Sequence, residues 1–138
     1  MAGGEQAILR AIAHYLVSSF RGNPVSMQKT GARVEGWREI NLENERRFGR
    51  FDTSGSFSAM YDEMDVWGAV FWTLRARVTG KGTDRLVVTT WTQAHAPGHA
   101  KEFRRDFAGS LVSITTESHG RESAEHVKDL LRSRGFKI

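Results

Sequence analysis

The sequence contains no cysteine and only two prolines among its 138 residues. Without cysteine there are no disulfide bonds, thiolate zinc sites or cysteine nucleophiles. No apolar run approaches the roughly 20 residues that a membrane-spanning helix needs. Glu5 and the single early Arg10 make the N-terminal segment a poor signal peptide. A mature exported domain whose leader has been removed is the alternative. We therefore expect a soluble protein without a membrane span, and favour the cytoplasm as its location.

The sequence also lacks the motifs of common cofactor and nucleophile sites. It has no phosphate-binding glycine loop, no dinucleotide fingerprint and no nucleophile elbow. The acidic run Asp62-Glu63-Met64-Asp65 has neither the ligand spacing nor the turn glycine of a calcium loop. We therefore assign no catalytic residue, no metal and no small-molecule cofactor.

The composition is that of an ordinary globular domain. Hydrophobic residues make up 39% of the chain and charged residues 26%, and the formal net charge is +4 with both signs mixed along the sequence. A dedicated nucleic-acid protein usually has a more lopsided basic stripe. No linker or internal repeat divides the chain, so residues 1–138 are predicted to form a single domain.

The stretch from Val66 to Ala94 is the centre of the predicted fold. It is rich in Val, Thr, Trp and Phe, and Thr79-Gly80-Lys81-Gly82-Thr83-Asp84 interrupts it with two glycines. Such residues favour strands, and glycines supply the positive φ angles of a tight reversal. The pattern predicts a β-hairpin with arms Val66–Val78 and Arg85–Ala94.

Helical patterns stand on both sides of this predicted hairpin. Apolar residues at helical spacing predict a helix over Glu5–Arg21, which ends at Gly22-Asn23-Pro24. A second helix is predicted from near His99 to about Ser113, although residues 111–117 also suit a strand, and a third over Arg121–Arg134. Further strands are expected near Val25–Gln28, Ala32–Leu42 and Arg46–Asp52. The predicted class is α+β: an N-terminal helix, an antiparallel sheet of about four to five strands centred on hairpin 66–94, and two C-terminal helices.

One face of the predicted hairpin combines aromatic and basic side chains. In a strand, Val70, Trp72 and Leu74 face one side, while the other side carries Trp67, Phe71, Arg75 and Arg77, with Trp91 on the neighbouring strand. Tryptophan and arginine dominate protein-binding hot spots, and rings beside guanidinium groups also stack bases. We therefore expect a non-catalytic binding module that acts through this sheet face or a sheet edge. A protein partner or self-association is the leading interpretation, and RNA or single-stranded nucleic acid is the alternative.

Two weaker patterns point to nucleic acid. In Arg46-Arg47-Phe48-Gly49-Arg50-Phe51 basic and aromatic residues interleave around a glycine. This run resembles the sheet motif of RNA-recognition domains and adds Arg47 and Arg50 to the candidate binding residues. His95 and His99 have the spacing of a helical zinc site, but Pro97-Gly98 between them forbids a continuous helix. As a general base beside Arg104 or Arg105, either histidine would suit a small metal-independent ribonuclease, a layout that is similar to some bacterial toxins.

Overall fold

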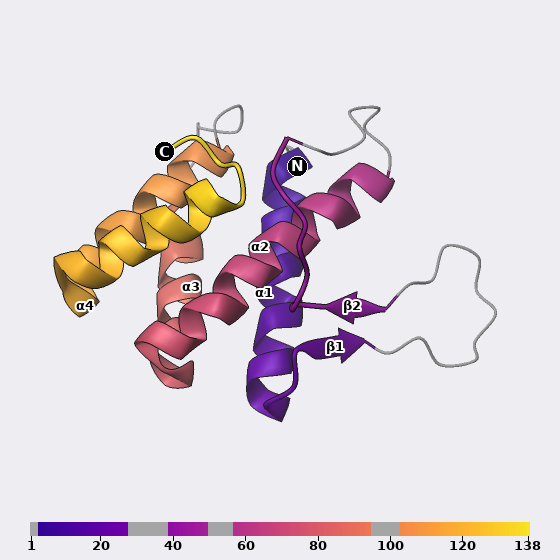
Figure 1. The fold of residues 1–138 in the computed structure, drawn as a ribbon, viewed down its shortest axis with the longest axis horizontal. Helices are drawn as coiled ribbons and strands as arrows, with labels where there is room; N and C mark the ends of the chain where they lie inside the picture. Colours follow the sequence, from indigo (N-terminus) through magenta and orange to yellow (C-terminus); the bar gives the residue numbers. More distant parts are fainter. Residues whose placement is uncertain (1–2, 28–38, 50–56, 95–102) are drawn as a thin grey trace.

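The protein is mostly helical. The computed structural model describes residues 3–27, 39–49, 57–94 and 103–138. Along the chain they form α1 (Gly3–Arg21), β1 (Val25–Met27), β2 (Ile40–Asn41), α2 (Phe57–Val78), α3 (Gly80–Ala94) and α4 (Phe103–Ser133) (Figure 1). The two short strands pair antiparallel, with Val25 opposite Asn41.

The predicted sheet centred on residues 66–94 is wrong. This stretch forms α2 and α3, and within the described residues the only sheet is the two-stranded β1–β2 pair. Alternation in a strand would send Trp67 and Phe71 to one face and Val70 and Leu74 to the other. In α2 all four side chains are at most 1% exposed, because residues three and four apart share one side of a helix. The expected strand over Arg46–Asp52 is also missing from its described part, residues 46–49.

The glycine-containing reversal is present in a tighter form. Thr79 alone separates α2 from α3, with φ of 80°, and its Oγ1 accepts a hydrogen bond from the backbone N–H of Gly82 at 3.2 Å. A threonine side chain that accepts an N–H in the first turn caps a helix N-terminus. The sequence signal at 79–84 therefore marks the start of a helix and not the tip of a hairpin.

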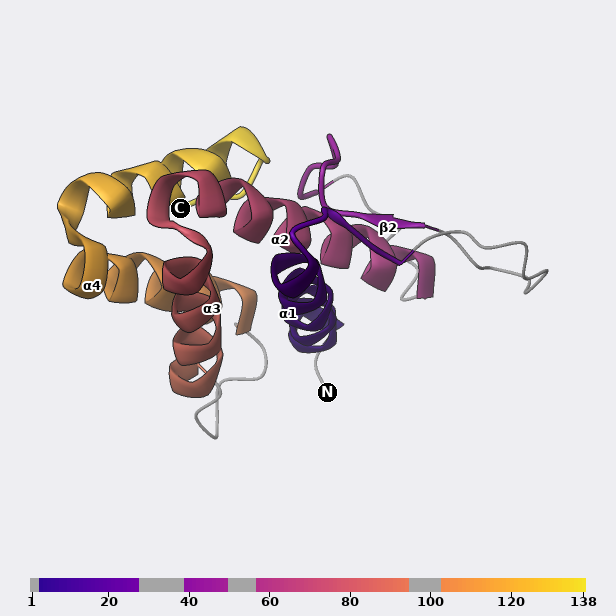
Figure 2. The same ribbon diagram turned by 90° about the horizontal axis from the view of Figure 1, so that it is seen from below.

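Helix α2 is the centre of the core. All residues from 63 to 71 are buried, so this part of the helix is covered around its whole circumference. Figure 2 shows α1 on one side of α2, with α3 and α4 beside them. The Trp67 ring meets Phe48 at 5.0 Å and Phe107 at 5.3 Å between centroids, both edge to face. Aromatic pairs in this geometry contribute about 0.5–1.5 kcal/mol beyond their area burial.

The C-terminal half follows the predicted breaks. Residues 111–117 are helical, and α4 kinks at Gly120, where φ is 87° and ψ is 170°. That conformation is essentially restricted to glycine, which explains why one helix becomes two segments there. Beyond Ser133, Gly135 has φ of 87° and the N–H of Phe136 donates to the carbonyl of Leu131 at 2.9 Å, as expected for a glycine that ends a helix.

The end of α4 holds the segment that follows β2. Arg134 Nη1 donates to the carbonyls of Asn44 at 2.6 Å and Arg46 at 3.0 Å, and the N–H of Phe48 donates to the carbonyl of Arg134 at 2.6 Å. The side-chain amide of Asn44 donates to the carbonyl of Asp65 in α2 at 3.0 Å. These bonds fasten residues 44–48 between α2 and the C-terminus, where Phe48 closes the core over Trp67.

Candidate functional site

The aromatic residues expected on a binding face lie inside the protein. Trp67 and Phe71 are 0% exposed, and each ring contacts Phe107. Trp91 of α3 is half-buried and packs edge to face on Phe103, with centroids 5.5 Å apart. Trp67 and Phe71 therefore belong to the core, and Trp91 packs at its edge with its ring partly covered.

The basic residues expected beside those rings are separated from one another. Arg75 is partly buried between α1 and α2, and its guanidinium lies 4.7 Å from the ring centroid of Trp72. Arg77 is exposed and bonds Glu122 of α4 at 2.7 Å. Of the two arginines predicted from the separate pattern over residues 46–51, Arg47 is exposed and Arg50 lies outside the described residues. No single surface holds the described members of this set.

A partly buried polar network joins the first three helices. The hydroxyls of Tyr15 and Ser19 both donate to Asp84 Oδ1 of α3 at 2.7 Å, and Arg75 Nη2 of α2 donates to the carbonyl of Ser19 at 3.3 Å. Burial, and then the bond to Asp84, raise the pKa of Tyr15 above its usual value. The bonds fix how α1, α2 and α3 pack, and we read the network as structural because it lies between packed helices.

A second buried charge links α2 to the start of α4. Glu63 is 2% exposed, and Arg104 binds it through two bonds, Nε at 2.5 Å and Nη2 at 2.7 Å. The Trp67 indole N–H donates to the same carboxylate at 3.3 Å. The bonds to Glu63 raise the pKa of the Arg104 guanidinium. Such bidentate pairs stabilise a buried carboxylate, and here the pair anchors the first turn of α4.

The outer face of α1 carries apolar side chains that the fold leaves uncovered. Phe20 is 93% exposed, Val17 is 45% exposed and Leu9 is 37% exposed. Together with Ala13 they recur at four, four and three residues, so they form one stripe along the helix. In Figure 2 α1 lies below α2, and no described helix or strand lies directly below it in that view. We call Leu9, Ala13, Val17 and Phe20 the α1 stripe.

Two arginines border the α1 stripe on one edge. At 100° per residue, Arg10 and Arg21 both fall on the edge nearer His14, whose Nδ1 lies 2.8 Å from Ser26 Oγ of β1. The six exposed residues described in α1 are the four of the stripe and these two arginines. The exposed residues of α1 are therefore all apolar or basic, and half-buried Glu5 and Gln6 lie on the same side toward its N-terminal end.

The sequence pattern hid this stripe. The helical spacing of the apolar residues predicts one packed face formed by Ile8, Leu9, Ile12, Leu16 and Phe20. The structure instead buries Ile8 and Ile12 together with Tyr15 and turns Leu9 and Phe20 outward. The available signal is that α1 has more large apolar residues than one face can bury.

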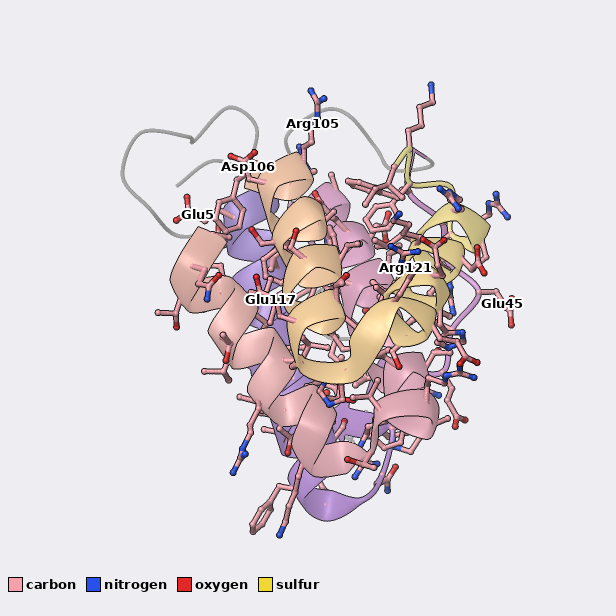
Figure 3. All side chains as sticks on the ribbon, turned by 90° about the vertical axis from the view of Figure 1, so that its left-hand side faces the viewer. Glu5, Glu45, Arg105, Asp106, Glu117 and Arg121 are labelled. Carbon is pink, nitrogen blue, oxygen red and sulfur yellow. The ribbon has the colours of Figure 1, made fainter. Side chains whose placement is uncertain are left out.

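A second surface feature is a hollow between α3 and the first segment of α4. It measures about 590 Å³, and Lys81, Arg85, Glu117 and His119 supply its charged and titratable side chains. A neighbouring hollow of about 650 Å³ runs along α4 past Asp106 to the C-terminus. Figure 3 shows this side, with Arg105 and Asp106 at the first turn of α4, Glu117 farther along and Arg121 after the kink. Side chains of both charge signs line each of the two hollows, so the charge of a ligand is not specified by the lining alone.

Neither metal chemistry nor a membrane span finds support in the described residues. They contain no group of three or more His, Asp or Glu side chains that could hold a metal ion. They also contain no helix that is long and apolar enough to cross a membrane. His95 and His99, on which the ribonuclease hypothesis depends, lie outside the described residues, so that hypothesis stays a prediction.

Comparison with known proteins gives no further information about this site. Searches against protein-family models, curated proteins and solved structures give no match for this chain. The features that distinguish the molecule are therefore the closed aromatic core around Trp67, the uncovered α1 stripe and the arginine edge beside it.

Proposed function

We propose that the protein is a non-catalytic binding domain that docks a protein partner on the α1 stripe. The observation that carries the proposal is the exposure of Phe20, a large aromatic side chain that is 93% exposed and in line with Val17 and Leu9. Single exposed apolar residues are common on protein surfaces, but several on one helix face mark an interaction site.

The rest of the fold suits a rigid docking surface. Helix α1 is fixed by the bonds of Tyr15 and Ser19 to Asp84, and its inner residues Ile8 and Ile12 are buried in the core. A partner would therefore meet a preformed surface and lose little additional conformational entropy on binding.

The test is a comparison of two serine variants of the full chain in a pull-down from the native source. Val17→Ser combined with Phe20→Ser should remove the captured partner, because both side chains would be central to the contact. Ile138→Ser is the matched control, since Ile138 is 40% exposed at the opposite end of the chain. Both variants should keep the melting temperature of the parent within about 2 °C, because exposed side chains contribute little to stability. Equal capture by all three proteins would contradict the proposal.

One observation favours RNA or single-stranded nucleic acid as a second candidate. Lys81 and Arg85 line the hollow between α3 and α4 beside the single carboxylate of Glu117, and the two cationic side chains could contact phosphates there. Binding of this kind weakens steeply with added salt, through counterion release. No retention of the protein on a single-stranded nucleic-acid column, or retention insensitive to salt, would exclude this candidate.

A further inference from the structure

We infer that the segment of the partner that docks on α1 is an amphipathic helix whose apolar stripe is bordered by acidic residues. This inference rests on the proposed function, since it names the chemistry of the partner for the same surface. It is supported by the shape of the α1 stripe and by the distribution of charge around it.

The shape of the stripe suits a second helix. Leu9 and Val17 lie two turns apart with Ala13 between them, so the small side chain leaves a recess between two larger ones. Helices pack when a side chain of one fills such a recess in the ridge of the other. The stripe from Leu9 to Phe20 spans twelve residues, with about 16 Å of helix between the first and the last, which is long enough for three turns of a partner.

The charge beside the stripe specifies the partner's sign. Arg10 and Arg21 are both exposed on the same edge, also eleven residues apart. Among the described residues neither arginine has an ion-pair partner. A partner helix with carboxylates along the facing edge would meet both guanidinium groups, whereas lysines there would be repelled.

A second copy of the chain fits this edge poorly. In an antiparallel two-fold contact between two α1 helices, Arg10 of one copy lies level with Arg21 of the other on the same edge. Four arginines would then stand in one row, and none of the exposed residues of α1 is acidic. Like charges placed together across an interface disfavour it, so the observations favour a different protein.

An anionic membrane also attracts arginines beside apolar side chains. A bilayer surface, however, rewards apolar groups that project from the helix, and on this stripe only Phe20 projects almost fully. Leu9 and Val17 are more than half covered by neighbouring residues of the protein. The recess at Ala13 would contribute nothing to binding on a lipid surface. A helix with a complementary ridge makes better use of this surface.

The experiment uses two synthetic stapled helices of about 18 residues, because shorter unstapled helices are marginal in water. Both carry leucines spaced to match the α1 stripe, and they differ only in having glutamates or lysines along the edge that would face the arginines. Fluorescence anisotropy measures the binding of each helix to the wild-type chain, to the double variant Arg10→Glu/Arg21→Glu, and to the control Arg105→Glu/Arg121→Glu. The control reverses two exposed arginines of α4 and gives the same net charge.

The glutamate helix should bind the wild-type chain at least about tenfold more tightly than the lysine helix, and added salt should reduce the difference. Arg10→Glu/Arg21→Glu should reverse this preference, while the control should change affinity by no more than about twofold. No binding, or equal binding of the two helices, overturns the inference.

Two further measurements separate the other occupants. Sedimentation with vesicles of anionic phospholipid that requires Arg10 and Arg21 overturns the inference in favour of a membrane surface. A concentration-dependent dimer in light scattering that Phe20→Ser dissociates overturns it in favour of a second copy. Loss of pull-down in the serine variants without binding of the glutamate helix leaves the proposed function standing and refutes only the acidic chemistry.

Discussion

Replacing Trp67 by alanine tests whether this residue belongs to the core or to a binding surface. Its side chain is 0% exposed at the centre of α2, and it contacts the rings of Phe48, Phe71, Phe107 and Phe136. A tryptophan buries roughly 150–250 Å², which at about 25 cal/mol per Å² corresponds to about 4–6 kcal/mol. Alanine retains part of this contribution, so we expect a loss of about 3–5 kcal/mol in the free energy of unfolding.

The loss should be visible as a large shift of the thermal transition. The entropy of unfolding is about 2.1 cal/mol/K per residue, or about 0.3 kcal/mol/K for this chain, so Trp67→Ala should lower the melting temperature by about 10–17 °C. Far-UV circular dichroism is the appropriate signal because it follows the helices and does not depend on tryptophan fluorescence. Urea unfolding of the same proteins gives the free energy directly.

Phe20→Ala is the matched control, since it also removes an aromatic ring from a helix. Phe20 is 93% exposed, so the change should alter the free energy of unfolding by no more than about 0.5 kcal/mol. A loss below about 1 kcal/mol for Trp67→Ala, or similar losses for both variants, would refute the assignment of these two residues to core and surface.

The other predictions concern single features of the helices. Gly120→Ala should destabilise the protein by about 1–3 kcal/mol, because φ of 87° with ψ of 170° is strained for alanine. Gly109→Ala, in the regular part of α4 with open space around it, should stabilise the protein by about 0.5–1 kcal/mol. Urea unfolding that ranks the two variants otherwise would contradict the kink at Gly120. Burial and the nearby Arg10 lower the pKa of His14, so the folded state favours the neutral ring and stability should fall as the pH drops below about 6.5. His14→Asn should flatten this fall when melting temperature is measured against pH. Parallel curves for the variant and the parent would contradict the assignment of the fall to His14. Because the pKa of Tyr15 is raised in the folded state, stability should fall as the pH rises above about 10. Tyr15→Phe loses the hydrogen bond to Asp84, so it should lower stability by about 1 kcal/mol at neutral pH. The same variant should show a smaller loss of stability at alkaline pH.

Features that depend on local backbone chemistry could be predicted from the sequence. Helix α1 ends at Arg21, directly before Gly22-Asn23-Pro24, and α4 breaks at Gly120 and ends before Gly135. Each of these ends depends on residues within one turn of it, so a short stretch of sequence contains the necessary information.

The identity of α2 could not be predicted in the same way. The helical period of an apolar pattern is visible only when one side of a helix faces water, and residues 63–71 are buried on all sides. The valines and aromatic rings then favour a strand by a few tenths of a kcal/mol each. Burying a single side chain such as Trp67 contributes several kcal/mol, so packing against α1 and α4 outweighs those preferences.

The candidate site depended on this assignment. A strand places Trp67 and Arg75 on one open face, whereas a helix sends the first into the core and leaves the second partly buried against α1. The α1 stripe was not predicted because a single sequence does not show how many of its apolar residues the rest of the chain can cover. Only the three-dimensional packing reveals that Leu9 and Phe20 are left outside.

Site-specific photo-cross-linking tests the docking surface most directly. A benzophenone side chain replaces Phe20 in one variant and the exposed Thr116 of α4 in another, and both full-length proteins are irradiated in extract of the native source. We expect a discrete adduct from position 20 that disappears when Val17→Ser is added, and none from position 116. Adducts of equal yield from both positions, or none from position 20, would contradict the conclusion that a partner docks on the outer side of α1.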